Sequence, residues 1–351
     1  MDERDVVIVG AGPAGASAGF FLKEERPDID VLMIDRLDEG KYSRYHRMCG
    51  EAISRAAFKD LAPLGPTNVV NRITRMREEW PGGRVVEAKA VGYILDRPAF
   101  LKGVLDRYRG RGGELIHDAV ERVSSVGKGT LLTMTSGRSV LARNLVAADG
   151  ANSVIRRTLF TEAPPIMIWT EQHIVKRKVR EDTITFLQAE RYKGFYRWEF
   201  PSGENARIGF PRGVDSLAGE EVLETHRRPI PMGGLRTLVK GNVLLTGDAG
   251  ALTNPLTAGG IRVAMLSGRR AAEAVLWGDP SSYQRWWDRS PFSSGTFMRA
   301  FRKLESMSDL EYEEASRGLN ANPLSLAWGY LTRPHLREIY GAYGPSGRYG
   351  W

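Results

Sequence analysis

Glycines at a phosphate-binding spacing are the first residues whose types and positions predict chemistry. The segment Gly10-Ala-Gly12-Pro13-Ala14-Gly15 lies between a short β-branched run and a stretch of helical character. In this context Gly10 permits a tight turn, Gly12 lets the backbone approach a pyrophosphate, and Gly15 lets a helix pack closely on a strand. The first turn of that helix, at Pro13 and Ala14, offers free N–H groups to phosphate. The segment therefore predicts a dinucleotide site.

A carboxylate about 20 residues further on completes the dinucleotide pattern. Asp35 ends a second β-branched run, residues 31–34, and Arg36 follows it. A carboxylate at this place accepts hydrogen bonds from ribose hydroxyls. We therefore assign Asp35 and Arg36 to the nucleotide end of the site, although this fingerprint alone does not distinguish NAD from FAD.

Two segments far downstream favour a flavin nucleotide. Each is a strand candidate that ends in an acidic turn. The first turn is Asp149-Gly150. The second is Gly247-Asp248, which is followed by Pro255 and Gly259-Gly260-Ile261. A carboxylate at a strand end can bind a ribityl hydroxyl, and a helix that starts after two glycines directs N–H groups at the flavin's pyrimidine oxygens. We therefore expect the cofactor to be FAD.

These motifs together resemble the hydroxylase-type FAD superfamily, and two further stretches are similar to its geranylgeranyl reductase family. Residues 44–54 resemble the family's basic and Cys-Gly-Glu segment, and residues 196–201 its Tyr-x-Trp-x-Phe-Pro motif, with Lys193 where the family usually has proline. The resemblance covers roughly residues 5–290. It implies that the cofactor is also contacted by Arg44, Cys49, Gly50 and Arg97.

The aromatic motif and the single cysteine are the candidates for work on a substrate. On a strand, Tyr196, Trp198 and Phe200 would project to one face, forming either a hydrocarbon-binding wall or ordinary core. Burial of a hydrocarbon chain there is worth about 0.8 kcal/mol per CH₂. Cys49, near Arg44, is a candidate proton relay with inert packing as the alternative, and Tyr196 is the next proton source.

The resemblance implies an FAD-dependent reductase that saturates isolated double bonds of geranylgeranyl or other polyprenyl chains, isoprenoid lipids included. The runner-up is a flavin-dependent monooxygenase or halogenase of the same superfamily, and a third hypothesis is a non-catalytic prenyl-binding escort. NAD(P)H, ferredoxin or another electron-donor protein remains open as the external reductant. The five histidines lack metal-ligand spacing, so no metal is expected.

Hydrophobic periodicity predicts the elements that position these residues. Buried strands, helices and then alternating runs indicate an α/β with α+β fold, in which a Rossmann-type FAD-binding domain carries an inserted antiparallel-sheet substrate domain and a helical C-terminus. We place the FAD-binding domain at residues 1–70, 96–160 and 240–280. The substrate domain takes residues 71–95 and 161–239, and the helical region residues 281–351.

Composition limits the partners. The 351 residues carry a net charge of +8, but the 50 basic residues are scattered among 42 acidic ones, so nucleic acid is not expected. The basic balance suits anionic lipid headgroups or prenyl diphosphates. One cysteine excludes an internal disulfide, and no stretch approaches the roughly 18 apolar residues of a membrane span. We expect a cytoplasmic protein, with peripheral attachment to a membrane surface left open.

Overall fold

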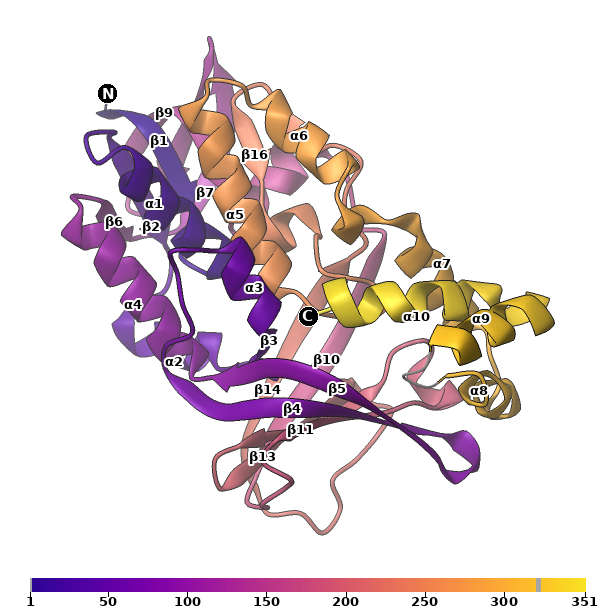
Figure 1. Cartoon of the computed structure of the whole chain (residues 1–351). Helices are drawn as coiled ribbons and strands as arrows, with labels where there is room; N and C mark the ends of the chain where they lie inside the picture. Colours follow the sequence, from indigo (N-terminus) through magenta and orange to yellow (C-terminus); the bar gives the residue numbers. More distant parts are fainter. Residues whose placement is uncertain (1, 320–322) are drawn as a thin grey trace.

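The computed structural model describes residues 2–319 and 323–351 and contains two β-sheets with a helical region beside them (Figure 1). The first sheet has the order β15-β16-β9-β1-β2-β6, and β8 joins it through β9 and β7 through β8. Its strands are β1 (Asp2–Val9), β2 (Val31–Asp35), β6 (Glu114–His117), β7 (Val120–Val126), β8 (Gly129–Met134), β9 (Ser139–Ala147), β15 (Val239–Lys240) and β16 (Val243–Leu245).

The centre of the first sheet is parallel, as the sequence predicts for a Rossmann-type domain. Strand β1 pairs in parallel with both β2 and β9, and all five residues of β2 are buried. This burial on both faces explains the continuous β-branched runs. Because parallel strands end at the same edge, the residues that follow β1, β2, β9 and β16 gather at one edge of the sheet.

Helices α1 (Pro13–Glu25), α4 (Arg97–Gly110) and α5 (Ile261–Leu276) lie side by side across this sheet (Figure 1). Small residues allow α1 and α5 to approach closely. A Cβ placed on Gly268 of α5 would lie 2.1 Å from the carbonyl oxygen of Ala14. The packing of these helices fixes the edge where the strands end.

The second sheet has the order β14-β10-β13-β12-β11-β4-β5-β3 and is antiparallel in its described part except between β11 and β4. Its strands are β3 (Ala52–Ser54), β4 (Val69–Trp80), β5 (Arg84–Leu95), β10 (Ile166–Val175), β11 (Thr183–Leu187), β12 (Arg197–Ser202), β13 (Asn205–Pro211) and β14 (Val222–Met232). Strand β3 joins this sheet through β5, although the sequence analysis groups residues 1–70 with the nucleotide domain.

The C-terminal region from residue 281 on is helical, as expected. It contains α6 (Ser281–Asp288), α7 (Gly295–Glu305), α8 (Asp309–Ser316), α9 (Pro323–Thr332) and α10 (Arg337–Tyr349). The remaining helices are α2 (Glu39–His46) and α3 (Arg55–Asp60), and single turns form at Pro81–Gly83, Arg156–Phe160, Glu190–Tyr192, Gly247–Gly250, Pro291–Ser293 and Pro334–Leu336. Tyr343 of α10 donates to Glu78 of β4 at 2.8 Å, so this region is anchored to the second sheet.

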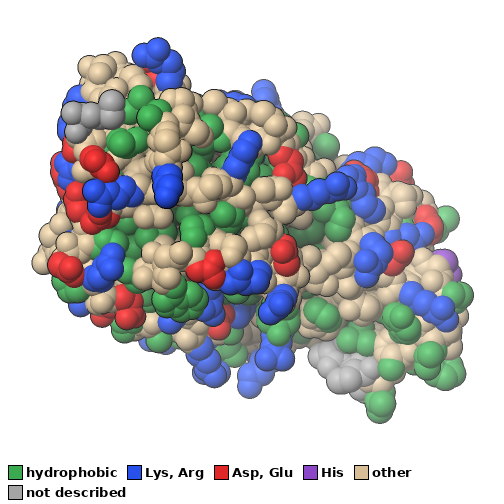
Figure 2. Space-filling model, turned by 90° about the horizontal axis from the view of Figure 1, so that it is seen from above, with side chains coloured by type: hydrophobic (Ala, Val, Ile, Leu, Met, Phe, Trp, Pro, Cys, Tyr) green, Lys and Arg blue, Asp and Glu red, His purple; other side chains and the backbone are tan. Residues whose placement is uncertain are grey.

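The surface shows no concentration of one charge on the face that Figure 2 presents. Lys and Arg side chains there are scattered among acidic ones. Within the described residues, no helix combines the length and the apolar character needed to cross a bilayer.

Candidate active site

A cavity of about 490 Å³ is lined by residues of both sheets. It brings together most of the residues that the sequence analysis singled out, although they are spread over more than two thirds of the chain. Those that line it are Gly10, Gly12, Pro13, Ala14, Asp35, Arg36, Cys49, Gly50, Arg97, Asp149, Gly150, Tyr196, Trp198, Phe200, Gly247, Asp248, Gly259, Gly260 and Ile261.

Three residues of the expected site are not among those that line the cavity. Gly15 lies behind it, where an added Cβ would meet the carbonyl oxygen of Gly10 at 1.8 Å, so it serves helix packing as expected. Pro255 lies in the loop between β16 and α5. Arg44 is exposed on α2 and lines a separate surface hollow with Arg47. The expected contact of Arg44 with the cofactor stays a prediction.

The turn predicted to bind phosphate has the geometry that its glycines require. Gly10 adopts φ +98°, and a Cβ there would lie 2.3 Å from the carbonyl oxygen of Ala148. Gly12 caps α1, whose first residue is Pro13, and both line the cavity. The N-terminus of α1 thus faces the cavity with its free N–H groups and the positive end of its dipole.

Asp35 is tied to this turn by backbone hydrogen bonds. Its carboxylate accepts from the N–H of Ala11 at 2.5 Å and from the N–H of Leu37 at 2.7 Å. Burial raises its pKa, and the two N–H donors act in the opposite direction. The carboxylate is therefore held beside the turn at the place expected for a ribose contact.

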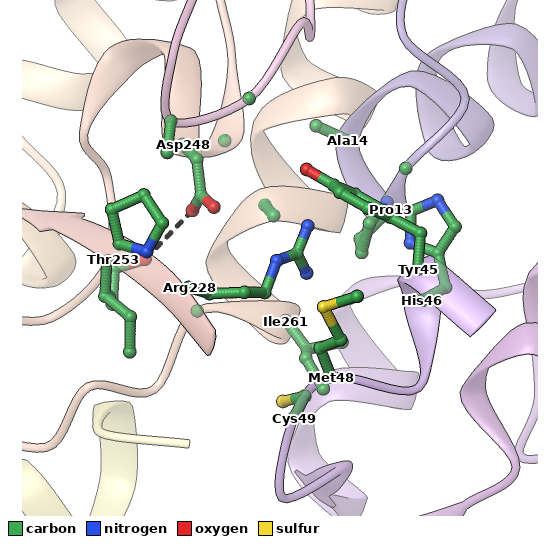
Figure 3. A pocket seen from close by; sticks show the side chains of 18 of the residues that line it. Pro13, Ala14, Tyr45, His46, Met48, Cys49, Arg228, Asp248, Thr253 and Ile261 are labelled. Atoms are coloured by element: carbon green, nitrogen blue, oxygen red, sulfur yellow. Dashed lines mark hydrogen bonds between the residues drawn. The ribbon is translucent and has the colours of Figure 1, made fainter. Parts of the chain in front are cut away.

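Arg156, which was not among the predicted site residues, joins the two acidic motifs at the other strand ends. This buried side chain donates to the carbonyl oxygens of Ala151 at 2.7 Å, Ala249 at 3.1 Å and Asp248 at 3.3 Å. It therefore fixes the loop after β9 against the loop after β16. Burial raises the pKa of Asp248, which accepts a 3.2 Å hydrogen bond from Thr253 (Figure 3).

Several features of the cavity fit a flavin nucleotide. A Cβ on Gly150 would meet nothing within 4 Å, so its backbone faces open space. Among the described residues, Oδ1 of Asp149 and both ring nitrogens of His46 are buried without a hydrogen-bond partner. Buried polar atoms of this kind normally have partners. A ligand with hydroxyl and ring-nitrogen groups would supply them.

The loop that carries Cys49 is held by a buried ion pair. Glu51 follows it with φ +61°, and the Glu51 N–H donates to Sγ of Cys49 at 3.3 Å. Arg207 of β13 lies 2.7 Å from the Glu51 carboxylate and donates to the carbonyl oxygens of Arg47 at 3.0 Å and Cys49 at 3.3 Å. Arg207 is therefore a cation beside the Cys49 loop, in a place for which the sequence predicted Arg44.

Tyr196, Trp198 and Phe200 form an aromatic wall together with Phe186. The three motif side chains line the cavity from one face of β12 and the residue before it. Phe186 contacts Tyr196 and Phe200 edge-on, with ring centroids 5.0 and 5.3 Å apart. The hydroxyl of Tyr196 donates to the carbonyl oxygen of Thr257. The three side chains therefore lie on one face of the strand, as the alternation along the sequence predicts.

Four residues that line the cavity were missed by sequence reasoning. They are Tyr45, His46, Met48 and Arg228 (Figure 3). Arg228 projects from β14, with its guanidinium carbon 3.9 Å from the Tyr45 ring centroid. Burial lowers the pKa of His46 well below its ordinary value, and Arg97 and Arg228 act in the same direction. No motif marks Arg228, because only the pairing of β14 with β10 brings it to the cavity.

Comparison with known proteins places these features in context. The chain is 32% identical to digeranylgeranylglycerophospholipid reductase 2 of Methanopyrus kandleri, over 89% of this chain and 88% of the relative. It is 27% identical to geranylgeranyl diphosphate reductase of Rhodobacter capsulatus, over 78% and 75%. No protein-family model matches the chain.

Solved structures share the fold. A geranylgeranyl bacteriochlorophyll reductase-like protein of Thermoplasma acidophilum superposes with a TM-score of 0.80 at 20% identity, over 97% of this chain and 99% of that one. The p-nitrophenol 4-monooxygenase of Pseudomonas putida reaches 0.74 at 14% identity, over 99% of each chain. The predicted fold class is therefore confirmed, and the flavin-dependent brominase Bmp2 shares the fold with a TM-score of 0.68 at 19% identity, over 97% of this chain and 94% of that one.

Proposed function

Because the chain belongs to the geranylgeranyl reductase family of flavin-dependent oxidoreductases, we propose that it binds FAD and saturates isolated double bonds of a geranylgeranyl or other polyprenyl chain. The observation that carries this proposal is the set of residues that line the cavity of about 490 Å³. It places the phosphate-binding turn and two strand-end carboxylates in continuity with an aromatic wall and a cysteine. We further propose that the two sheets correspond to an FAD-binding and a substrate-binding domain, with the helical region as a third part.

The residues that would hold FAD fall into two groups. Gly10, Gly12 and the first turn of α1 would take the pyrophosphate, with Asp35 and Arg36 at the adenosine ribose. Asp149, Asp248 and the N-terminus of α5 would take the ribityl chain and the flavin ring. Two helix N-termini at one cavity provide positive potential for the phosphates and for a reduced flavin.

When bound, reduced FAD supplies a hydride to one alkene carbon, and the protein must provide a proton for the other. An isolated alkene offers no charge for the site to stabilise, so placement and exclusion of water carry the protein's contribution. The buried aromatic wall serves both needs. Cys49 and Tyr196 line the same cavity as the two candidate proton donors.

Burial keeps Tyr196 in the form that can donate. Its pKa is raised by burial, so the phenol stays protonated at neutral pH. Its proton already points at the carbonyl oxygen of Thr257, whereas Sγ of Cys49 accepts from a backbone N–H. We therefore propose Cys49 as the direct donor and Tyr196 as its alternative.

The substrate and the electron supply follow from the same proposal. We propose a polyprenyl or isoprenoid-lipid substrate, met in the cytoplasm or at a membrane surface, because a basic protein attracts anionic headgroups. The external reductant is NAD(P)H or a carrier protein such as ferredoxin.

Product mass distinguishes reduction from the monooxygenase reaction of a fold neighbour. The FAD-loaded protein is reduced under anaerobic conditions, incubated with geranylgeranyl substrates, and the products are analysed by mass spectrometry. A gain of about two mass units per saturated bond is expected from addition of hydride and proton. Unchanged substrate without oxygen, followed by oxygen insertion once air is admitted, would replace the proposal with a monooxygenase function.

A further inference from the structure

The segment at Gly350 and Trp351 returns from the helical region to the active-site cavity. Helix α10 ends at Tyr349, and Figure 1 shows the C-terminus in the middle of the molecule, near α3 and α5. Trp351 is one of the residues that line the cavity. No motif in the sequence marks it, and it belongs to neither sheet.

Side chains from three different parts of the fold hold the backbone of this segment. Arg262, at the start of α5, is itself fixed by an ion pair with Asp60 at 2.6 Å. The three hydrogen bonds run from Nη1 of Arg262 to the carbonyl oxygen of Arg348 at 2.7 Å, from Oγ1 of Thr257 to that of Gly350 at 2.5 Å, and from Oγ of Ser54 to that of Trp351 at 2.8 Å.

Two glycines provide the space that this segment occupies. A Cβ on Gly259 would lie 1.6 Å from the carbonyl oxygen of Gly350, and one on Gly92 would lie 2.5 Å from two ring carbons of Trp351. Gly259 is therefore required by the close approach of Gly350, in addition to any role toward a flavin. The indole lies on β5 and packs against the core that contains the aromatic wall.

We propose that the Trp351 indole forms part of the wall that contacts the prenyl chain, and that it determines how long a chain the cavity accepts. The inference rests on the proposed function and names a residue for substrate selection. An aromatic ring gives a large and rigid apolar surface. Its removal lowers affinity for the chains that touch it and opens space that longer chains can fill.

Binding of geranylgeraniol to the oxidised, FAD-loaded protein tests this role without the reaction. The variant Trp351→Ala is compared with Trp351→Phe, which keeps a ring, and with Trp328→Ala, whose side chain is 67% exposed on α9. We expect about tenfold weaker binding for Trp351→Ala, from the range that apolar pockets discriminate. Trp351→Phe should bind nearly as the parent does, and Trp328→Ala should bind unchanged.

Chain length gives the second readout. The ratio of affinities for geranylfarnesol and farnesol should rise in Trp351→Ala, because the vacated space admits the longer chain. If Trp351→Ala does not retain FAD and the unfolding temperature of the parent, Trp351→Leu replaces it as a folded variant without a ring. Unchanged affinity and unchanged length preference in the folded variant would overturn the inference.

The same experiment separates this inference from the proposed function. A parent protein that binds geranylgeraniol but never reduces it contradicts the reductase activity, while the Trp351 variants still decide the role of the indole. A parent protein that binds none of the prenyl alcohols contradicts both.

Discussion

Cys49 and Tyr196 occupy the same cavity with different surroundings, and their variants should separate proton delivery from packing. Cys49→Ser keeps the size nearly constant but replaces the thiol with a far weaker acid. Loss of a proton-transfer group costs about 10²–10⁴-fold in rate, so product formation should fall by at least the lower part of that range. Flavin reduction by an artificial donor should stay fast and FAD should stay bound.

Tyr196→Phe is the matched variant, since it removes only the hydroxyl that donates to Thr257. Near-normal saturation by Cys49→Ser together with a large loss in Tyr196→Phe would transfer the role to the tyrosine. Product analysis under single-turnover conditions measures both.

The buried pair of Glu51 and Arg207 makes a prediction about pH. Burial raises the pKa of Glu51 to about 7, against an opposing effect of Arg207. Between the ordinary glutamate pKa and about 7, the folded protein holds a proton that the unfolded chain has lost. The free energy of unfolding therefore falls as pH rises through this window, by at most about 1.4 kcal/mol per pH unit from this group.

Glu51→Gln should remove that share of the pH dependence. Denaturant unfolding of the FAD-loaded protein at pH values from about 5 to 7 gives the slope. Glu204→Gln is the control, because its carboxylate is 83% exposed. A slope in Glu51→Gln that equals those of the parent and of Glu204→Gln would show that Glu51 does not titrate in this window.

At the residue scale, sequence reasoning placed the residues of contiguous motifs correctly. The glycines at 10, 12 and 15 and the carboxylates at 35, 149 and 248 lie where strand ends and helix starts predict. Arg228 and Trp351 were missed because each reaches the cavity only through long-range pairing or chain return. Arg207 was missed because only the position of β13 brings it to Glu51 and to the carbonyl oxygens of the Cys49 loop. Nothing in their neighbours along the sequence records those contacts.

At the scale of elements, the contact of α1 with α5 sets the position of both helix N-termini at the cavity. Gly268→Ala should separate these helices, because its Cβ would lie 2.1 Å from Ala14 O and 3.0 Å from Ala18 N, which are backbone atoms. Overpacking of this kind costs about 1–3 kcal/mol of stability. FAD affinity should fall with it.

Gly103→Ala on α4 is the matched control, since nothing lies within 4 Å of its added Cβ. Replacing a glycine by alanine inside a helix, where no clash results, stabilises the folded protein by about 0.5–1 kcal/mol. Thermal unfolding of both variants checks the pair. If the two substitutions changed the unfolding temperature equally, α1 and α5 would be able to move apart without cost.

Hydrophobic periodicity predicted most of the elements but not how they assemble. Strands β1, β2 and β16 of the first sheet follow from buried runs, and helices α1, α4 and α5 from helical spacing. Strand β14 was not named in advance, since residues 222–232 are polar and contain prolines at 229 and 231. The eight-strand order of the second sheet depends on contacts between residues far apart in the chain, which periodicity does not encode.

For the whole molecule, we propose that FAD contacts the loops that follow β1, β2, β9 and β16, which are far apart in the sequence. Asp248→Ala should weaken FAD binding by about tenfold to a hundredfold, the equivalent of one hydrogen bond to a charged group. Asp106→Ala, whose carboxylate is 71% exposed on α4, should bind FAD normally. Equilibrium titration of the stripped proteins with FAD decides the point, and equal affinities would remove Asp248 from the cofactor site.

We propose that one cavity brings a reduced flavin and a prenyl chain together for direct transfer. Rapid anaerobic mixing of the reduced, FAD-loaded protein with a geranylgeranyl substrate tests it most directly, with the oxidised-flavin absorbance followed over time. The account predicts that the flavin is reoxidised without oxygen, at a rate that rises with substrate concentration, and that one bond is saturated per flavin. A flavin that stays reduced until oxygen is admitted, with the substrate bound but unchanged, would contradict it.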